Sequence, residues 1–105
     1  MAYSLEYDRN VVLPYLRDYQ GLSRQGRLAL FTTLRQYLGE NGDEFRNDAS
    51  LRRWGADSPC FEFPLVFGDP DVPGALRLFR FIVNDEAAQY GVLRVVFVDD
   101  QTIPS

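Results

Sequence analysis

The chain of 105 residues contains no lysine, no histidine and a single cysteine, Cys60. The absence of histidine removes the commonest general base and metal ligand, together with any Ser-His or Cys-His nucleophile pair. One cysteine excludes an internal disulfide and a cysteine-rich metal site. We expect Cys60 to be a small buried hydrophobic residue, since no histidine is present to activate it. The sequence therefore predicts no metal and no other cofactor.

The sequence also lacks long apolar runs. The N-terminus has neither the basic nor the apolar region of a signal peptide, and no apolar stretch is long enough to span a bilayer. Together with the scarcity of cysteine, these absences predict a cytoplasmic bacterial protein without membrane contact. Hydrophobic residues make up 46% of the chain and aromatic residues 14%, which is enough apolar surface for one core. We expect a single domain over residues 1–105.

The charged residues are of unusual composition. All 11 cations are arginine, and they are opposed by 15 carboxylates, so that the net charge is −4. Lysine avoidance is typical of a GC-rich genome, and the alternative is selection for the planar guanidinium group, which binds phosphate or carboxylate through two hydrogen bonds. An acidic chain lacks the overall field of a nucleic-acid binder. Such a role would require arginines to gather on one face.

The sequence of the N-terminal half predicts one strand and two helices. Alternation over residues 3–7 indicates a strand with one buried face. Asp8, Asn10 and Pro14 favour the start of a short helix that ends at Gly21. Ser23 is the expected N-cap of a second helix that ends at Gly39 or Gly42. The apolar stripe of this second helix consists of Leu28, Phe31, Leu34 and Leu38.

The C-terminal half predicts a β-meander. Residues 40–58 read as a loop with one helical turn. Residues 60–67 alternate as a strand with Phe61, Phe63, Leu65 and Phe67 on one face, and Pro64 restricts this strand to a sheet edge or a bulge. After a turn at 68–74, strands over 75–83 and 92–99 are joined by residues 84–91. Alternation places Leu93, Val95 and Phe97 on the predicted core face of the last strand, and Asp99-Asp100 is expected to be a turn rather than a metal site. The predicted fold is α+β, in the order β-α-α-β-β-β, with two N-terminal helices packed on a small antiparallel sheet.

Two arginine-bearing strands carry a family resemblance. Residues 76–81 are similar to a Leu-Trp-Glu-Leu-Arg strand, with Arg80 in the arginine position, and residues 92–100 are similar to Tyr-Arg-Val-Leu-Tyr-Phe-Val-Asp-Asp, with Arg94 in the arginine position. With the opening strand 3–7 and the helix 28–38, this order resembles the RelE/ParE toxin superfamily, in particular its phage-related HigB-like branch. The resemblance spans nearly the whole chain.

The resemblance implies a toxin of a toxin–antitoxin module that cuts messenger RNA on the ribosome. It implies Arg80 and Arg94 as catalytic residues, with Arg77 and Tyr90 as RNA-binding residues. A cognate antitoxin protein, messenger RNA with the ribosome, and a second copy of the chain are the partners it leaves open. Taken singly, the pattern favours each arginine as a surface residue or as the ion-pair partner of Asp85, Glu86, Asp99 or Asp100.

A second function class is consistent with the same residues. The chain is acidic where family members are basic, and residues 101–105 have no counterpart of the family's basic tail. The faces of both arginine-bearing strands are mostly apolar, which indicates either a covering loop or a partner surface. The alternative is a non-catalytic interaction domain on the same scaffold, which binds a protein partner or itself through its apolar sheet face.

Overall fold

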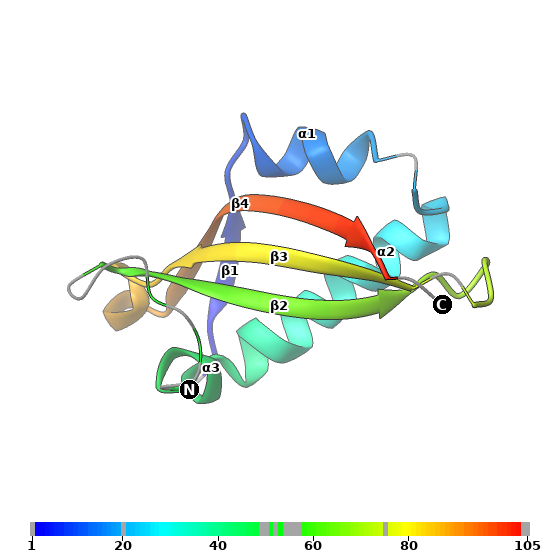
Figure 1. Cartoon of the computed structure of the whole chain (residues 1–105). Coiled ribbons are helices and arrows are strands. Elements are labelled where there is room, and N and C mark those ends of the chain that lie inside the picture. The colour runs from blue at the N-terminus through cyan, green and yellow to red at the C-terminus, as the bar shows by residue number, and fades with distance from the viewer. Residues whose placement is uncertain are drawn as a thin grey trace.

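The computed structural model describes residues 2–19, 21–48, 51, 53, 58–74 and 76–103, which form an α+β fold around a four-stranded sheet (Figure 1). The α+β class predicted from the sequence is confirmed. None of the described helices is long and apolar enough to cross a membrane. The strands are β1 (Ser4–Tyr7), β2 (Cys60–Gly68), β3 (Leu76–Asn84) and β4 (Val92–Thr102). The helical segments are α1 (Val12–Arg17), α2 (Arg24–Leu34), the π-helical η1 (Arg35–Glu40), α3 (Gly42–Arg46) and the 3-10 turn η2 (Ala88–Tyr90).

The sheet is mixed. Its strands lie in the order β1-β4-β3-β2, and both β2–β3 and β3–β4 are antiparallel. The first strand runs parallel to β4, with Ser4 opposite Val92 and Tyr7 opposite Val95. The prediction of an antiparallel sheet is therefore wrong at β1. Side-chain alternation reports which face of a strand is buried, but it does not report the direction of a partner strand far away in the sequence.

The loop predicted over residues 40–58 contains the one helical turn expected of it, in the form of α3 (Gly42–Arg46). Residues 49, 50, 52 and 54–57 of this segment lie outside the described residues. At the far side of the segment, β2 lies at the sheet edge, as Pro64 requires.

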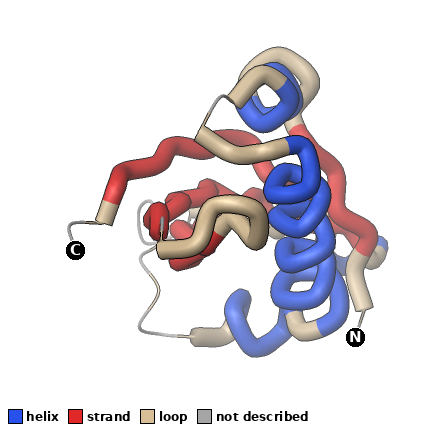
Figure 2. The backbone as a smooth tube through the Cα atoms, turned by 90° about the vertical axis from the view of Figure 1, so that its right-hand side faces the viewer, coloured by secondary structure: helices blue, strands red, loops and turns tan. Residues whose placement is uncertain are grey.

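One face of the sheet is covered by helix and forms the core. Figures 1 and 2 show α2 and η1 running along this face, which lies behind the sheet in Figure 1. Leu30, Leu34 and Leu38 are at most 1% exposed there. They pack with the phenylalanines of β2 and β3, namely Phe61, Phe63, Phe67, Phe79 and Phe81. The buried face of residues 60–67 is thus the one predicted from the sequence.

The apolar stripe of α2 is rotated from the predicted one. Leu34 and Leu38 are buried as expected, but Leu28 is 55% exposed and Leu30 takes its place in the core. Residues 26, 30, 34 and 38 repeat every four positions, which is also a helical spacing. Spacing alone did not separate the two stripes, because the choice depends on where α1 and β1 lie.

A β-bulge in β4 changes which residues face the core. Ile82 of β3 is opposite Phe97, whereas the next residue, Val83, is opposite Val95, so that Val96 is the extra residue. Before the bulge Leu93 and Val95 face the core, and after it Val98 does. The predicted core position of Phe97 is therefore wrong, and its side chain is 39% exposed on the other face.

The short α1 helix begins at a turn made by Asp8. Its Oδ1 accepts hydrogen bonds from the backbone N–H groups of Asn10 and Val11, both at 2.8 Å. Val12 and Leu16 then enter the core. Because β1 pairs only with residues 92–95 of β4, the second half of β4 has no strand on that side, and α1 lies beside it (Figure 1).

The N-terminus of α2 is held by a buried carboxylate. Asp69 is 5% exposed and accepts hydrogen bonds from the Ser23 backbone N–H at 2.6 Å and from the Ser23 hydroxyl at 2.9 Å. The Ser23 hydroxyl in turn accepts from the Gly26 N–H at 2.9 Å, as an N-cap does. A Cβ atom at Gly26 would lie 2.6 Å from the Asp69 carboxylate, so glycine makes room for this contact.

Asp69→Asn is expected to make stability less dependent on acid pH. The backbone hydrogen bond from Ser23 lowers the pKa of the Asp69 carboxyl. A lowered folded-state pKa adds stability that is fully present above the ordinary aspartate pKa and is lost as the pH falls through the folded-state value. Urea midpoints should show the variant less stable than wild type near neutral pH, with the gap closing below about pH 4. A gap that stays constant with pH would contradict this role.

Candidate functional site

Arg80 lies at the centre of the sheet face that no described helix covers. This open face is defined by three rows of cross-strand neighbours, Val66–Leu78–Gln101, Pro64–Arg80–Asp99 and Glu62–Ile82–Phe97. The Arg80 guanidinium donates through Nε to Asp99 at 3.0 Å and forms an ion pair with Glu62 at 3.2 Å. The hydrogen bond to Asp99 raises the pKa of Arg80 further above its usual range. Arg80 is thus a charged residue between two carboxylates.

Arg94 lies on the same side of the sheet but at its other end. Its guanidinium donates to Glu6 of β1 at 3.0 and 3.3 Å. The two residues are directly opposite each other because β1 is parallel to β4. Along β3, Arg94 is opposite Asn84, which is four residues from Arg80. At ~3.3 Å per residue this separates the two arginines by about 13 Å along the strands, so that they do not flank one another.

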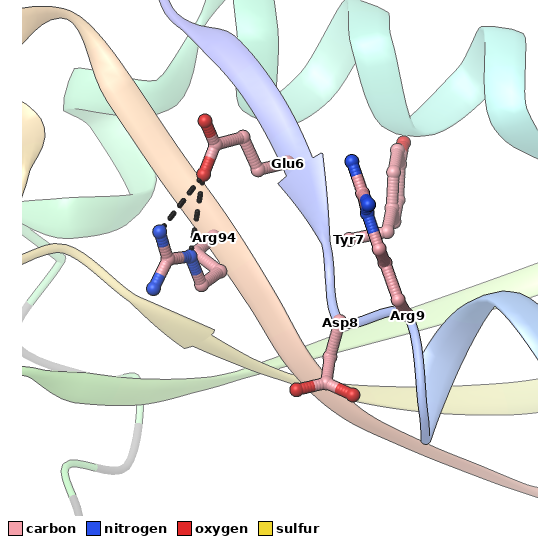
Figure 3. A pocket seen from close by; sticks show the side chains of 5 residues that line it. All are labelled: Glu6, Tyr7, Asp8, Arg9 and Arg94. Carbon is pink, nitrogen blue, oxygen red and sulfur yellow. Dashed lines mark hydrogen bonds and ion pairs between the residues drawn. The ribbon is translucent and has the colours of Figure 1, made fainter.

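A depression of about 470 Å³ surrounds the end of β1 and is lined by Glu6, Tyr7, Asp8, Arg9 and Arg94. Figure 3 shows Glu6 and Arg94 on one side of β1, with Tyr7 and Arg9 on the other and Asp8 pointing away from both. Burial raises the pKa of Tyr7 to about 12, so its hydroxyl stays protonated at neutral pH. The charged groups of the depression therefore diverge and do not face one reacting atom.

Arg77 faces the opposite side of the sheet from Arg80. It forms an ion pair with Asp100 at 3.1 Å, and its guanidinium lies 5.5 Å from the centre of the Tyr19 ring. The hydroxyls of Tyr15 and Tyr19 also donate to the Asp100 carboxylate. The Asp100 side chain is 12% exposed, and burial raises the pKa of its carboxyl. This cluster ties α1 to β3 and β4.

Asp99 and Asp100 are not in the turn predicted from the sequence. Both lie within β4, where they point to opposite faces of the sheet, Asp99 toward Arg80 and Asp100 toward Arg77. Within the described part of the chain, no cluster of carboxylates or cysteine has the arrangement of a metal site.

Tyr90 is distant from Arg77. It ends η2 in the connection between β3 and β4 and is 78% exposed. Arg77 is opposite Thr102 at the far end of the same hairpin. The four residues that the resemblance assigns to the site thus occupy two faces and both ends of the sheet, and only Arg80 and Arg94 share a face.

The arginines of the sheet are engaged by carboxylates. The ion-pair interpretation is confirmed for Arg80 with Asp99 and for Arg77 with Asp100. Glu6 as the partner of Arg94 was missed by the sequence analysis, because parallel pairing of β1 with β4 leaves no local signal. Away from the sheet centre, Asp85 binds both Arg46 at 3.3 Å and Arg53 at 3.1 Å.

Comparison with known proteins found no match: no protein-family model, no curated protein and no solved structure matches the chain.

Proposed function

We propose that the chain is a non-catalytic interaction domain on a RelE/HigB-like scaffold, and that it associates with a second copy of itself through the open face of the sheet. The observation that carries this proposal is the pairing of Arg80 and Arg94 with carboxylates of neighbouring strands. The succession of β1, α1, α2 and three further strands supports the scaffold.

The charges on the open face favour association with a protein over catalysis on an RNA phosphate. An RNA phosphate at Arg80 would have to displace Asp99 and would meet the negative charge of Glu62, in a chain whose net charge is −4. A catalytic arginine must be aimed at developing charge on the substrate before the substrate binds. The observed pairs aim Arg80 and Arg94 at protein carboxylates.

The open face has the composition of a self-complementary surface. Val66 is 58% exposed, Leu76 at its border is 47% exposed and Phe97 is 39% exposed. The charges between them are of both signs, Arg80 and Arg94 against Glu6, Glu62 and Asp99. A two-fold contact can therefore bring apolar residues together while each guanidinium keeps or exchanges a carboxylate. The face is nearly neutral, which suits a second copy of an acidic chain.

Val66→Asp is expected to convert the dimer to a monomer in sedimentation equilibrium. A carboxylate placed beside Leu78 on the open face would lose solvation on association. Leu28→Asp is the matched control, because it makes the same kind of change at a similarly exposed residue on the helical side, and it should leave the dimer intact. A wild-type chain that sediments as a monomer at about 1 mM would overturn the proposal.

A second candidate is the ribosome-dependent messenger RNA endoribonuclease of a toxin–antitoxin module. It is favoured by the shared face and exposure of Arg80 and Arg94, whose side chains are 48% and 58% exposed. Exposed ion pairs are weak and exchange readily for another anion.

Induced expression in a bacterial host tests the nuclease directly. An active toxin should arrest growth, and the Arg80→Ala/Arg94→Ala double variant should relieve the arrest while keeping the wild-type urea midpoint. Growth and messenger RNA that stay intact under wild-type expression would exclude this candidate and leave the interaction domain.

A further inference from the structure

A groove with an apolar floor and a cationic rim lies on the helical side of the molecule, away from the open face. Leu13 of α1 and Leu28 and Phe31 of α2 line a hollow of about 460 Å³. A second hollow of about 540 Å³ continues from the same Leu28 and Phe31 toward β1, where Tyr7 contributes its ring. Tyr7 and Phe31 meet edge to face with their centres 5.3 Å apart, which joins the two floors.

The rim of this groove is strongly positive for so acidic a chain. Arg17, Arg24 and Arg27 line the first hollow and Arg35 the second, and among the residues that the structure describes no aspartate or glutamate lines either. The whole chain carries a net charge of −4. The two hollows are therefore lined by arginine without a carboxylate, although Asp18 lies beside Arg17.

Two of these arginines are available to a ligand. Arg24 and Arg35 are exposed and form no ion pair within the part of the chain that the structure describes. Arg17 pairs with the neighbouring Asp18 at 3.2 Å, in an exposed contact. Arg27 differs from these, because it donates to the backbone carbonyls of Tyr19 at 3.0 Å and Leu22 at 3.3 Å and so holds the connection between α1 and α2 against α2.

We propose that this groove binds an acidic, amphipathic segment of a partner protein. Apolar side chains of the segment would fill the floor at Leu13, Leu28 and Phe31, and its carboxylates would pair with Arg24 and Arg35. An amphipathic helix matches such a groove, since it presents apolar residues at intervals of three and four along one face and charged residues beside them. This surface is separate from the open face.

The floor favours a protein ligand over a nucleic acid. Leu13 and Leu28 offer aliphatic surface, and Leu28 is 55% exposed in the isolated chain. A nucleic-acid strand would place phosphates on the arginines but would leave these leucines without apolar partners. An acidic amphipathic peptide supplies apolar side chains for the floor and carboxylates for the arginines of the rim.

Selection from a displayed library of random peptides of about 15 residues, roughly four helical turns, tests the proposal with the full chain. Selected peptides should be rich in aspartate and glutamate and should carry leucine, isoleucine or phenylalanine at intervals of three and four. Leu28→Asp and the Arg24→Glu/Arg35→Glu double variant should each weaken their binding by about tenfold or more. Val66→Asp, on the open face, should bind them as the wild type does.

Three results would overturn the proposal. The first is a selection without enrichment, or with enrichment of basic peptides. The second is equal binding of the selected peptides to wild type and to Leu28→Asp, with both chains shown to be folded by matching urea midpoints. The third is tighter binding of a single-stranded oligouridine than of any selected peptide, lost in Arg24→Glu/Arg35→Glu but retained in Leu28→Asp, which would assign the groove to nucleic acid.

Discussion

Leu34→Ala is expected to lower the free energy of unfolding by about 2–5 kcal/mol. Leu34 is fully buried between α2 and the sheet, among the core phenylalanines. Truncation removes apolar surface from the core and leaves a cavity that the surrounding aromatic rings fill only in part. Urea denaturation followed by circular dichroism measures the loss.

Leu28→Ala supplies the matched comparison, because the same change is made in the same helix. Leu28 is 55% exposed, so its truncation should cost less than about 0.5 kcal/mol. Similar losses at both positions would show that α2 is rotated from the orientation described. Phe97→Ala should cost as little stability as Leu28→Ala, because the bulge at Val96 turns the Phe97 side chain away from the core.

Asp100→Ala is expected to destabilise the fold by about 2–4 kcal/mol. The Asp100 carboxylate accepts from the hydroxyls of Tyr15 and Tyr19 and pairs with Arg77. Its removal takes away the acceptor of both hydroxyls and the negative charge beside Arg77, whose side chain is 30% exposed. Burying groups without their hydrogen-bond partners costs more than the bonds contributed.

Asp99→Ala is the control for this change, made at the adjacent residue. Asp99 faces the open side of the sheet, where its ion pair with Arg80 is accessible to water, with 39% and 48% of the two side chains exposed. Its loss should cost far less, because exposed ion pairs contribute little to stability. Equal losses for the two variants in thermal or urea unfolding would contradict the assignment of Asp100 to the buried side.

The pH dependence of stability separates Asp100 from Asp69. Burial raises the folded-state pKa of Asp100, so its ionisation costs stability as the pH rises through that value. The opposite holds for Asp69, whose lowered pKa makes ionisation favourable to folding. As the pH falls through the acid range, protonation of Asp100 therefore favours the folded state, whereas protonation of Asp69 disfavours it.

Sequence patterns located the elements well because they report local physics. The alternation of Phe61, Phe63, Leu65 and Phe67 identified the buried face of β2, and Pro64 placed that strand at an edge. Ser23 was recognised as a helix N-cap from its residue type and position. Each of these features depends on a few neighbouring residues, and their chemistry does not change with the rest of the fold.

The arrangement of the candidate site could be predicted less well from the same local patterns. Arg80 and Arg94 were singled out by family-like strands, but whether they meet depends on the β3–β4 register and on the bulge at Val96. Their carboxylate partners come from three different strands, with Glu62 in β2, Asp99 in β4 and Glu6 in β1. The cationic groove likewise joins α1 and α2 through side chains that no single periodic pattern brings together.

By itself, the sequence determined the α+β class, the approximate place of the four strands and of α1 and α2, and the absence of histidine chemistry. Tertiary structure alone decided the parallel pairing of β1 with β4, the face occupied by Phe97 and the side of α2 on which Leu28 lies. The physical reason is the range of the interactions involved. Helix capping and strand alternation act within a few residues, whereas register, bulges and ion pairs between strands are settled only when distant segments compete for the same core and the same carboxylates.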